Sequence, residues 1–128
     1  KVVDLDRAQR FLDSDTVTRC LNAEAGYKEY RFNVKLPAWR IDPEIDTAFR
    51  EEEVILQGAV DLAFVEDGEL VIVDYKTDRV KAPEILAERY AAQLMLYKDA
   101  MEACLGLPVK ECLIYSIDQS SAVKVYQK

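Results

Sequence analysis

The sequence predicts an α/β fold, a central mixed β-sheet flanked by helices, on three observations. Two apolar runs, at about 53–65 and 69–76, are joined by the turn sequence Glu66-Asp67-Gly68. A long helical pattern then runs from Pro83 to Leu105. Two more strand-like segments follow that helix, at about 110–117 and 122–127. Strands interrupted by a long helix indicate a layered domain in which helices cover the sheet.

Two short helices are expected at the N-terminus. They span Leu5 to Leu12 and Thr16 to Ala25, and either Ser14 or Asp15 is placed to cap the second one. Serine and aspartate suit this position because their side-chain oxygens accept hydrogen bonds from the free backbone N–H groups of the first helical turn.

One strand and one loop come next. The segment Tyr27 to Leu36 alternates between apolar and polar residues, which predicts a strand with one buried face. Glu29 lies on the polar face, directed either to a metal site or to solvent. Residues 37–50 carry Trp39, two prolines and several acids, and are expected to form a variable loop.

The long helix carries three polar or aromatic residues on one face. Tyr90, Gln93 and Tyr97 are spaced i, i+3 and i+7, and therefore lie on the same side of the helix. A tyrosine in this position is most often a packing residue with a solvated hydroxyl group. Gln93 fits that explanation less well, because a buried amide needs hydrogen bonds. The alternative is that Gln93 faces a phosphate or an attacking water.

Two acids and a lysine are predicted to meet at one end of the sheet. Successive side chains of a strand point to opposite faces, so Asp74 and Lys76 project from the same side. The Asp-Gly turn folds the second strand back antiparallel to the first, which can bring Asp61 beside Asp74. Magnesium sites use oxygen ligands, commonly one or two carboxylates with water and substrate phosphate. Two carboxylates this close repel each other unless a cation or a proton neutralises them.

The same residues also have a purely structural explanation. Acids and lysines commonly end strands, so an Asp-x-Lys triplet alone is a weak signal. Asp74, however, follows Leu70 to Val73, a run that is apolar on both faces and therefore predicts a buried central strand. A charge at the end of such a strand needs a partner or a metal, because burial of an unpaired charge is costly.

Three short motifs follow one another along the chain: Gly58-Ala-Val-Asp61, Val73-Asp-Tyr-Lys-Thr-Asp78 and Tyr90-Ala-Ala-Gln93-Leu-Met-Leu-Tyr97. In this order they resemble the motifs of RecB-like nucleases in the PD-(D/E)XK superfamily. The chain is most similar to the nuclease domain at the C-terminus of AddA (RexA) helicase–nuclease subunits. Phe11-Leu12-Asp13-Ser14 and Glu29-Tyr30-Arg31-Phe32 resemble the blocks that precede the G-x-x-D strand there. The order and spacing of the motifs are specific, and the resemblance covers nearly the whole chain.

This resemblance implies a restriction-endonuclease-like fold and metal-assisted hydrolysis of phosphodiester bonds. Mg²⁺ or Mn²⁺ would be held by Asp61, Asp74 and the backbone carbonyl of Tyr75. Lys76 would orient or help to deprotonate the attacking water, or stabilise the developing negative charge. The resemblance also implies catalytic roles for Glu29, Gln93 and Tyr97. It further implies contacts to DNA from Thr77, Tyr90, Gln93 and Tyr97.

Histidine and cysteine content bear on this resemblance. The family has an upstream histidine that helps to bind the metal, whereas this chain has no histidine and begins at Lys1. We therefore expect residues 1–128 to be a single nuclease domain excised from the C-terminus of a larger helicase–nuclease. Related Cas4 and AddB nucleases hold an iron–sulfur cluster with four cysteines. Cys20, Cys104 and Cys112 lack C-x-x-C spacing, so no iron–sulfur cluster is expected, which favours the AddA type.

The composition indicates an acidic cytosolic domain, and the resemblance implies the bacterial cytoplasm. The net charge of −7 argues against a strong autonomous DNA-binding protein, because phosphate contacts supply most sequence-independent affinity. No apolar run reaches the ~18 residues of a membrane helix, so no membrane partner is expected. Three cysteines without framework spacing indicate reduced thiols, with Cys104 and Cys112 as packing residues.

The acidic character suits a nuclease that is supplied with single-stranded DNA by a helicase motor. Tethering to such a motor raises the effective concentration of the strand at the nuclease. The resemblance implies a role in resecting double-strand breaks for recombinational repair, with an AddB-like protein as the partner. Two alternatives stay open: a catalytically inactive nuclease-fold module that guides DNA, and a phage-type exonuclease unrelated to helicases. Metal binding would distinguish the inactive module from an active nuclease. A P-loop in the upstream sequence would distinguish a helicase–nuclease subunit from a phage-type exonuclease.

Overall fold

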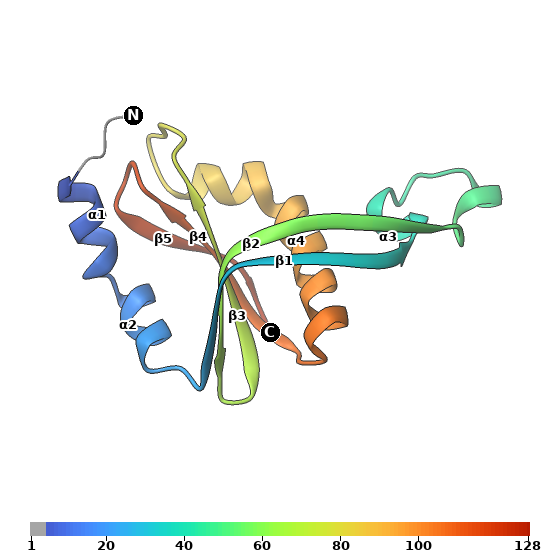
Figure 1. Cartoon of the computed structure of the whole chain (residues 1–128). Helices are drawn as coiled ribbons and strands as arrows, with labels where there is room; N and C mark the ends of the chain where they lie inside the picture. The colour runs from blue at the N-terminus through green and yellow to red at the C-terminus, as the bar shows by residue number, and fades with distance from the viewer. Residues whose placement is uncertain (1–4) are drawn as a thin grey trace.

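The computed structural model describes residues 5–128 as a five-stranded mixed sheet with helices on both faces (Figure 1). The strands lie in the sheet in chain order, from β1 to β5. Neighbouring strands are antiparallel except β3 and β4, which are parallel and are connected by the long helix α4. The predicted α/β fold with a mixed central sheet is therefore confirmed.

The elements agree closely with the expected pattern of strands and long helix. Strand and helix ends fall within about two residues of the predicted ones, except in the two segments described next. The bounds are α1 Leu5–Leu12, α2 Asp15–Leu21, β1 Ala25–Pro37, α3 Ala38–Ile41, η1 Thr47–Phe49, β2 Glu53–Glu66, β3 Glu69–Lys76, α4 Glu84–Leu105, β4 Val109–Ser116 and β5 Ser121–Gln127.

Two local predictions were wrong. Helix α2 is capped by Ser14 as expected but ends at Leu21 and not at Ala25. It ends early because the Glu24 N–H donates to the carbonyl of Val65, which draws the chain into the sheet. Residues 37–50 are not only loop, since they contain the short helices α3 and η1. The Asp46 side chain caps η1 by accepting a hydrogen bond from the Ala48 N–H at 2.9 Å.

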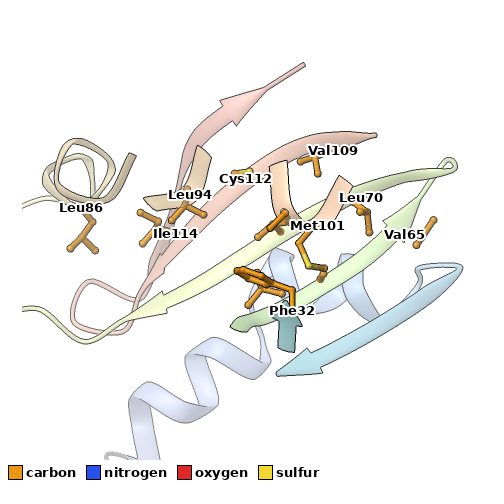
Figure 2. Close-up of a cluster of buried hydrophobic side chains, with 13 residues drawn as sticks. Phe32, Val65, Leu70, Leu86, Leu94, Met101, Val109, Cys112 and Ile114 are labelled. Atoms are coloured by element: carbon orange, nitrogen blue, oxygen red, sulfur yellow. The ribbon is translucent and has the colours of Figure 1, made fainter. Parts of the chain in front are cut away.

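The sheet separates two groups of buried side chains. Helix α4 covers one face, where Leu86, Leu94 and Met101 pack over Leu70 and Ile114 of the strands (Figure 2). The other face packs against α1 and α2 with Leu62, Phe64, Val71, Val73, Leu113 and Tyr115. Alternate residues of β3 thus enter opposite layers, which explains why its sequence is apolar on both faces. Among residues 5–128, no helix is long and apolar enough to cross a membrane.

Strands β1 and β2 continue beyond the rest of the sheet as a bent two-stranded ribbon (Figure 1). Their mutual pairing extends to Pro37 and Glu53, whereas β2 leaves β3 after the pair Leu62–Val73. Glu29, with a φ of 47°, has left-handed backbone geometry within β1. An ion pair between Arg40 of α3 and Asp99 of α4 ties the ribbon to the helix.

Candidate active site

Asp61 and Asp74 come together at the point where β2 separates from β3. Leu62 and Val73 are the last paired residues, so Asp61 and Asp74 are the next positions across from each other. The Tyr75 N–H has no β2 carbonyl as its partner here and donates to Asp61 Oδ2 at 2.8 Å. The end of strand pairing thereby makes room for two carboxylates side by side.

The Asp74 carboxylate is held in a position that disfavours its charge. Its side chain is buried, with 5% of the residue exposed. Burial and the contact with the Asp61 carboxylate raise the pKa of Asp74 to about 6, against the opposing attraction of Lys76. Asp74 Oδ2 lies 2.9 Å from Lys76 Nζ, yet no donor is aligned on it for a hydrogen bond. This oxygen therefore retains the capacity to bind a proton or a cation.

Lys76 lies between the acid pair and helix α4. Its Nζ is 2.9 Å from Asp74 Oδ2 and donates a hydrogen bond to Gln93 Oε1 at 3.2 Å. The ammonium group also lies over the ring of Tyr90, 4.1 Å from the ring centroid. Burial lowers the pKa of Lys76, but the close contact with the Asp74 carboxylate and its charge outweigh this effect, so the net shift is upward. The charged form of Lys76 is thus favoured.

Helix α4 directs its shared face at this lysine. Gln93 uses both ends of its amide, because Oε1 accepts from Lys76 and Nε2 donates to the Tyr97 hydroxyl at 3.3 Å. The Tyr90 hydroxyl donates to Asp78 Oδ2 at 2.8 Å. The i, i+3, i+7 spacing therefore does bring all three side chains to one place. The partners of Gln93 in the structure are Lys76 and Tyr97.

Glu29 and Thr77 lie apart from this hydrogen-bonded set. Glu29 is exposed and lines an open groove of about 720 Å³ on the β1–β2 ribbon together with Asp61, Arg31, Asn33 and Gln57. The neighbouring pairs Lys28–Leu62 and Tyr30–Val60 place Glu29 across from Asp61. The Thr77 side chain is exposed just after Lys76. Neither side chain forms a hydrogen bond or an ion pair within residues 5–128 that links it to Lys76.

Two contributions to the site were missed by sequence reasoning. Asp78 accepts hydrogen bonds from Arg89 at 2.7 Å and from Tyr90 at 2.8 Å, and so joins the segment after β3 to α4. The Tyr90 and Arg89 contacts lower the pKa of Asp78. Its place at the end of the V-D-Y-K-T-D motif was the available signal. The second contribution is Phe32, whose ring contacts the ring of Tyr97 at a centroid distance of 5.4 Å.

The acid pair fits a small divalent cation. Within the described residues 5–128, no three side chains of His, Cys, Asp or Glu converge, so the carboxylate donors here are Asp61 and Asp74. They provide two adjacent carboxylates, one of which has a buried oxygen without a hydrogen bond. A bound cation would relieve the repulsion that raises the pKa of Asp74. Oxygen donors of this kind match the preferences of Mg²⁺ and Mn²⁺.

Comparison with known proteins connects this geometry to a family. Residues 4–127 match the model of the PD-(D/E)XK nuclease superfamily. Similar proteins include the A subunits of the ATP-dependent helicase/nuclease from Clostridium perfringens (38% identity, 98% of this chain), Clostridium acetobutylicum (31%, 96%) and Clostridium botulinum (32%, 98%). The matched region makes up 10% of each of these relatives, so the chain spans about a tenth of their length.

Proposed function

Since the chain belongs to the PD-(D/E)XK nuclease superfamily, we propose that it is a metal-dependent deoxyribonuclease domain with exonuclease activity on single-stranded DNA. The observation that carries this proposal is the continuous set of contacts from Asp61 through Asp74 and Lys76 to Gln93. Two carboxylates and a charged donor at one point are the groups that phosphodiester hydrolysis needs.

The acid pair is the proposed metal site. Asp61 and Asp74, with the backbone carbonyl of Tyr75, would hold Mg²⁺ or Mn²⁺. A bound divalent cation lowers the pKa of a coordinated water and neutralises charge on the scissile phosphate. The Tyr75 N–H orients Asp61 by its hydrogen bond at 2.8 Å, so the backbone of β3 holds the first carboxylate next to the second.

Lys76 is proposed to stabilise the negative charge that develops on the phosphate oxygens. Its pKa is raised, so it carries a proton and acts as a cation and hydrogen-bond donor. This role is favoured over deprotonation of the attacking water, which would require a neutral amine. Gln93 fixes the ammonium position from one side, and the Tyr90 ring covers it from another.

The DNA contacts are proposed to come from α4 and from the residue after Lys76. Tyr90, Gln93 and Tyr97 carry polar groups on the face next to the catalytic lysine. The exposed Thr77 hydroxyl is free to contact a phosphate oxygen. Glu29 lies across from Asp61 in the groove and is proposed to act on the same metal or its water.

The wider proposal is that this domain serves in an AddAB-type helicase–nuclease of the bacterial cytoplasm. The similarity to helicase/nuclease A subunits over nearly the whole chain supports it. In such an enzyme a motor supplies single-stranded DNA to the nuclease, an AddB-like protein is the partner, and break resection for recombination is the task. The net charge of −7 accords with a nuclease that depends on a motor for its substrate.

Cleavage of end-labelled single-stranded DNA by the full protein in Mn²⁺ tests this function. We expect Lys76→Ala to lower the cleavage rate about 10²–10³-fold, the usual effect of losing one transition-state donor. Asp74→Ala should abolish cleavage. Lys35→Ala is the control for Lys76→Ala, because it removes a positive charge from an exposed position of β1, and it should leave cleavage unchanged. Undiminished cleavage by Lys76→Ala would contradict its role. A parent protein that neither cleaves DNA nor binds Mn²⁺ would favour the inactive-module alternative.

A further inference from the structure

Gly58 lies against an aromatic ring that leaves no space for a larger residue. It is the cross-strand partner of Phe32 in the β1–β2 ribbon. A Cβ atom at position 58 would lie 2.7 Å from Phe32 Cζ and 3.2 and 3.3 Å from the two Cε atoms. The backbone of Gly58 does not have a positive φ, unlike those of Gly68 and Gly106. Glycine is therefore required here for space and not for backbone conformation.

The other side of the Phe32 ring faces the active-site helix. Phe32 is 4% exposed, and its ring meets that of Tyr97 edge-to-face, at a centroid distance of 5.4 Å and an interplanar angle of 71°. The ring is thus held between the backbone of β2 and the side chain of Tyr97. A shift of the ring away from β2 would change its contact with Tyr97.

Tyr97 is connected to Lys76 through one residue. Its hydroxyl accepts a hydrogen bond from Gln93 Nε2 at 3.3 Å, and Gln93 Oε1 accepts one from Lys76 Nζ at 3.2 Å. Three consecutive contacts therefore lead from Phe32 to the proposed catalytic ammonium. Phe32 is buried and Tyr97, Gln93 and Lys76 are partly buried, so little free space is available to absorb a displacement of the ring.

We propose that Gly58 and Phe32 are positioning residues, which set the place of Tyr97 and Gln93 and through them the orientation of Lys76. This inference rests on the proposed function of Lys76 and assigns a task to the glycine of the G-x-x-D motif. The same strand would then serve the site twice. Asp61 supplies a carboxylate, and Gly58, three residues earlier, seats the ring that aligns the opposing helix.

Gly58→Ala in the full protein is the direct test, with Gly26→Ala as the matched control. A Cβ at Gly26 would meet only Cys20 Sγ at an ordinary 3.9 Å, so this control adds a methyl group to the neighbouring strand β1 without a clash. We expect Gly58→Ala to lower kcat for single-stranded DNA about 10- to 100-fold with a much smaller change in KM, because small misplacements of catalytic groups have effects of this size. The control should behave as the parent.

A double variant separates positioning from simple packing. Phe32→Leu removes the ring atoms that a Cβ at position 58 would strike, but it also removes the contact with Tyr97. Gly58→Ala alone should lower the unfolding midpoint. The double variant Gly58→Ala with Phe32→Leu should restore the midpoint of the parent but not its kcat. Recovery of kcat together with the midpoint would overturn the proposal, because the ring would then be only a packing residue.

A readout that does not depend on cleavage completes the experiment. With 3-fluorotyrosine replacing Tyr97 alone, the fluorine NMR shift should move in Gly58→Ala and in Phe32→Leu but not in Gly26→Ala. An unchanged shift in Gly58→Ala would overturn the positioning role. A parent protein that cleaves no DNA would contradict the proposed nuclease function instead, and the fluorine shift would still decide the positioning.

Discussion

Asp74 carries a charge that the folded chain accommodates at a cost. Its pKa of about 6 lies above the ordinary 3.8, chiefly because of burial and then because of Asp61. Because the folded-state pKa lies above the unfolded value, protonated Asp74 stabilises the folded protein. This contribution to stability is complete below pH 3.8 and is lost as the pH rises through about 6. At neutral pH the metal-free protein is thus strained at the residue that is proposed to bind the metal.

We predict that Asp74→Asn stabilises the metal-free protein at pH 8 while weakening metal binding. Asparagine carries no charge at any pH, so it avoids the loss of folding stability that the ionised Asp74 carboxylate causes above pH 6. The expected gain in unfolding free energy is about 1–3 kcal/mol. Urea unfolding in EDTA at pH 8 and pH 4 measures it, and the gain should shrink at pH 4. Asp6→Asn, on the exposed first turn of α1, serves as the control. A gain that is the same at both pH values would contradict the shifted pKa.

Helix α2 is attached to the sheet at the end of β3 opposite the active site. Arg19 binds Glu66 of β2 at 2.8 Å and Glu111 of β4 at 2.5 Å, and Lys110 binds Glu66 at 2.6 Å. The hydrogen bond from Arg19, and then that from Lys110, lowers the pKa of Glu66 to about 2. This network holds the element in place without taking part in the proposed chemistry.

Glu66→Gln should reduce stability in a pH-dependent way without affecting cleavage. A folded-state pKa below the ordinary 4.5 means that the contribution is present above pH 4.5 and is lost as pH falls towards 2. Because the group is partly exposed, we expect a loss of about 1–2 kcal/mol at pH 7 after screening by solvent. Urea unfolding between pH 7 and pH 2 measures this, and the difference from the parent should vanish at the acidic end. A loss that persists unchanged at pH 2 would have another cause.

Elements with long periodic patterns could be predicted, and very short ones could not. The strands and α4 follow from alternation and from the boundaries at Pro83 and Gly106, whose φ of 67° ends the helix. Helix α3 has four residues and η1 has three, too few to display a period. The early end of α2 depends on a hydrogen bond to Val65, far away in the sequence.

The site was predictable as far as strand alternation and helical spacing reach. Lys76 meets Asp74 because residues two apart in a strand share a face, and Gln93 meets Lys76 from the helix that follows. Two features of the site lie on the bent ribbon and were not predicted. They are the left-handed φ of Glu29 and the contact of Phe32 with Tyr97. A local sequence pattern carries no information about such a bend, because it depends on how β1 and β2 leave the sheet.

The whole molecule assembles the site from three separate parts. The departure of β2 from β3 supplies the gap for the acid pair, the parallel crossover places α4 over the same end of β3, and the bent ribbon presses Phe32 against α4. This arrangement (Figure 1) means that no single segment contains the proposed active site. The charge balance fits as well, since the chain has an acidic excess but carries Lys76 in contact with Asp74 and Arg89 in contact with Asp78.

Calorimetric titration of the full protein with Mn²⁺ at pH 8 tests most directly whether the buried acid pair is a metal site. The parent should bind Mn²⁺, Asp74→Asn should bind it at least about tenfold more weakly, and Lys76→Ala should retain binding because it removes only a neighbouring cation. Equal affinity of the parent and Asp74→Asn for Mn²⁺ would contradict the assignment of Asp61 and Asp74 as the metal-binding pair.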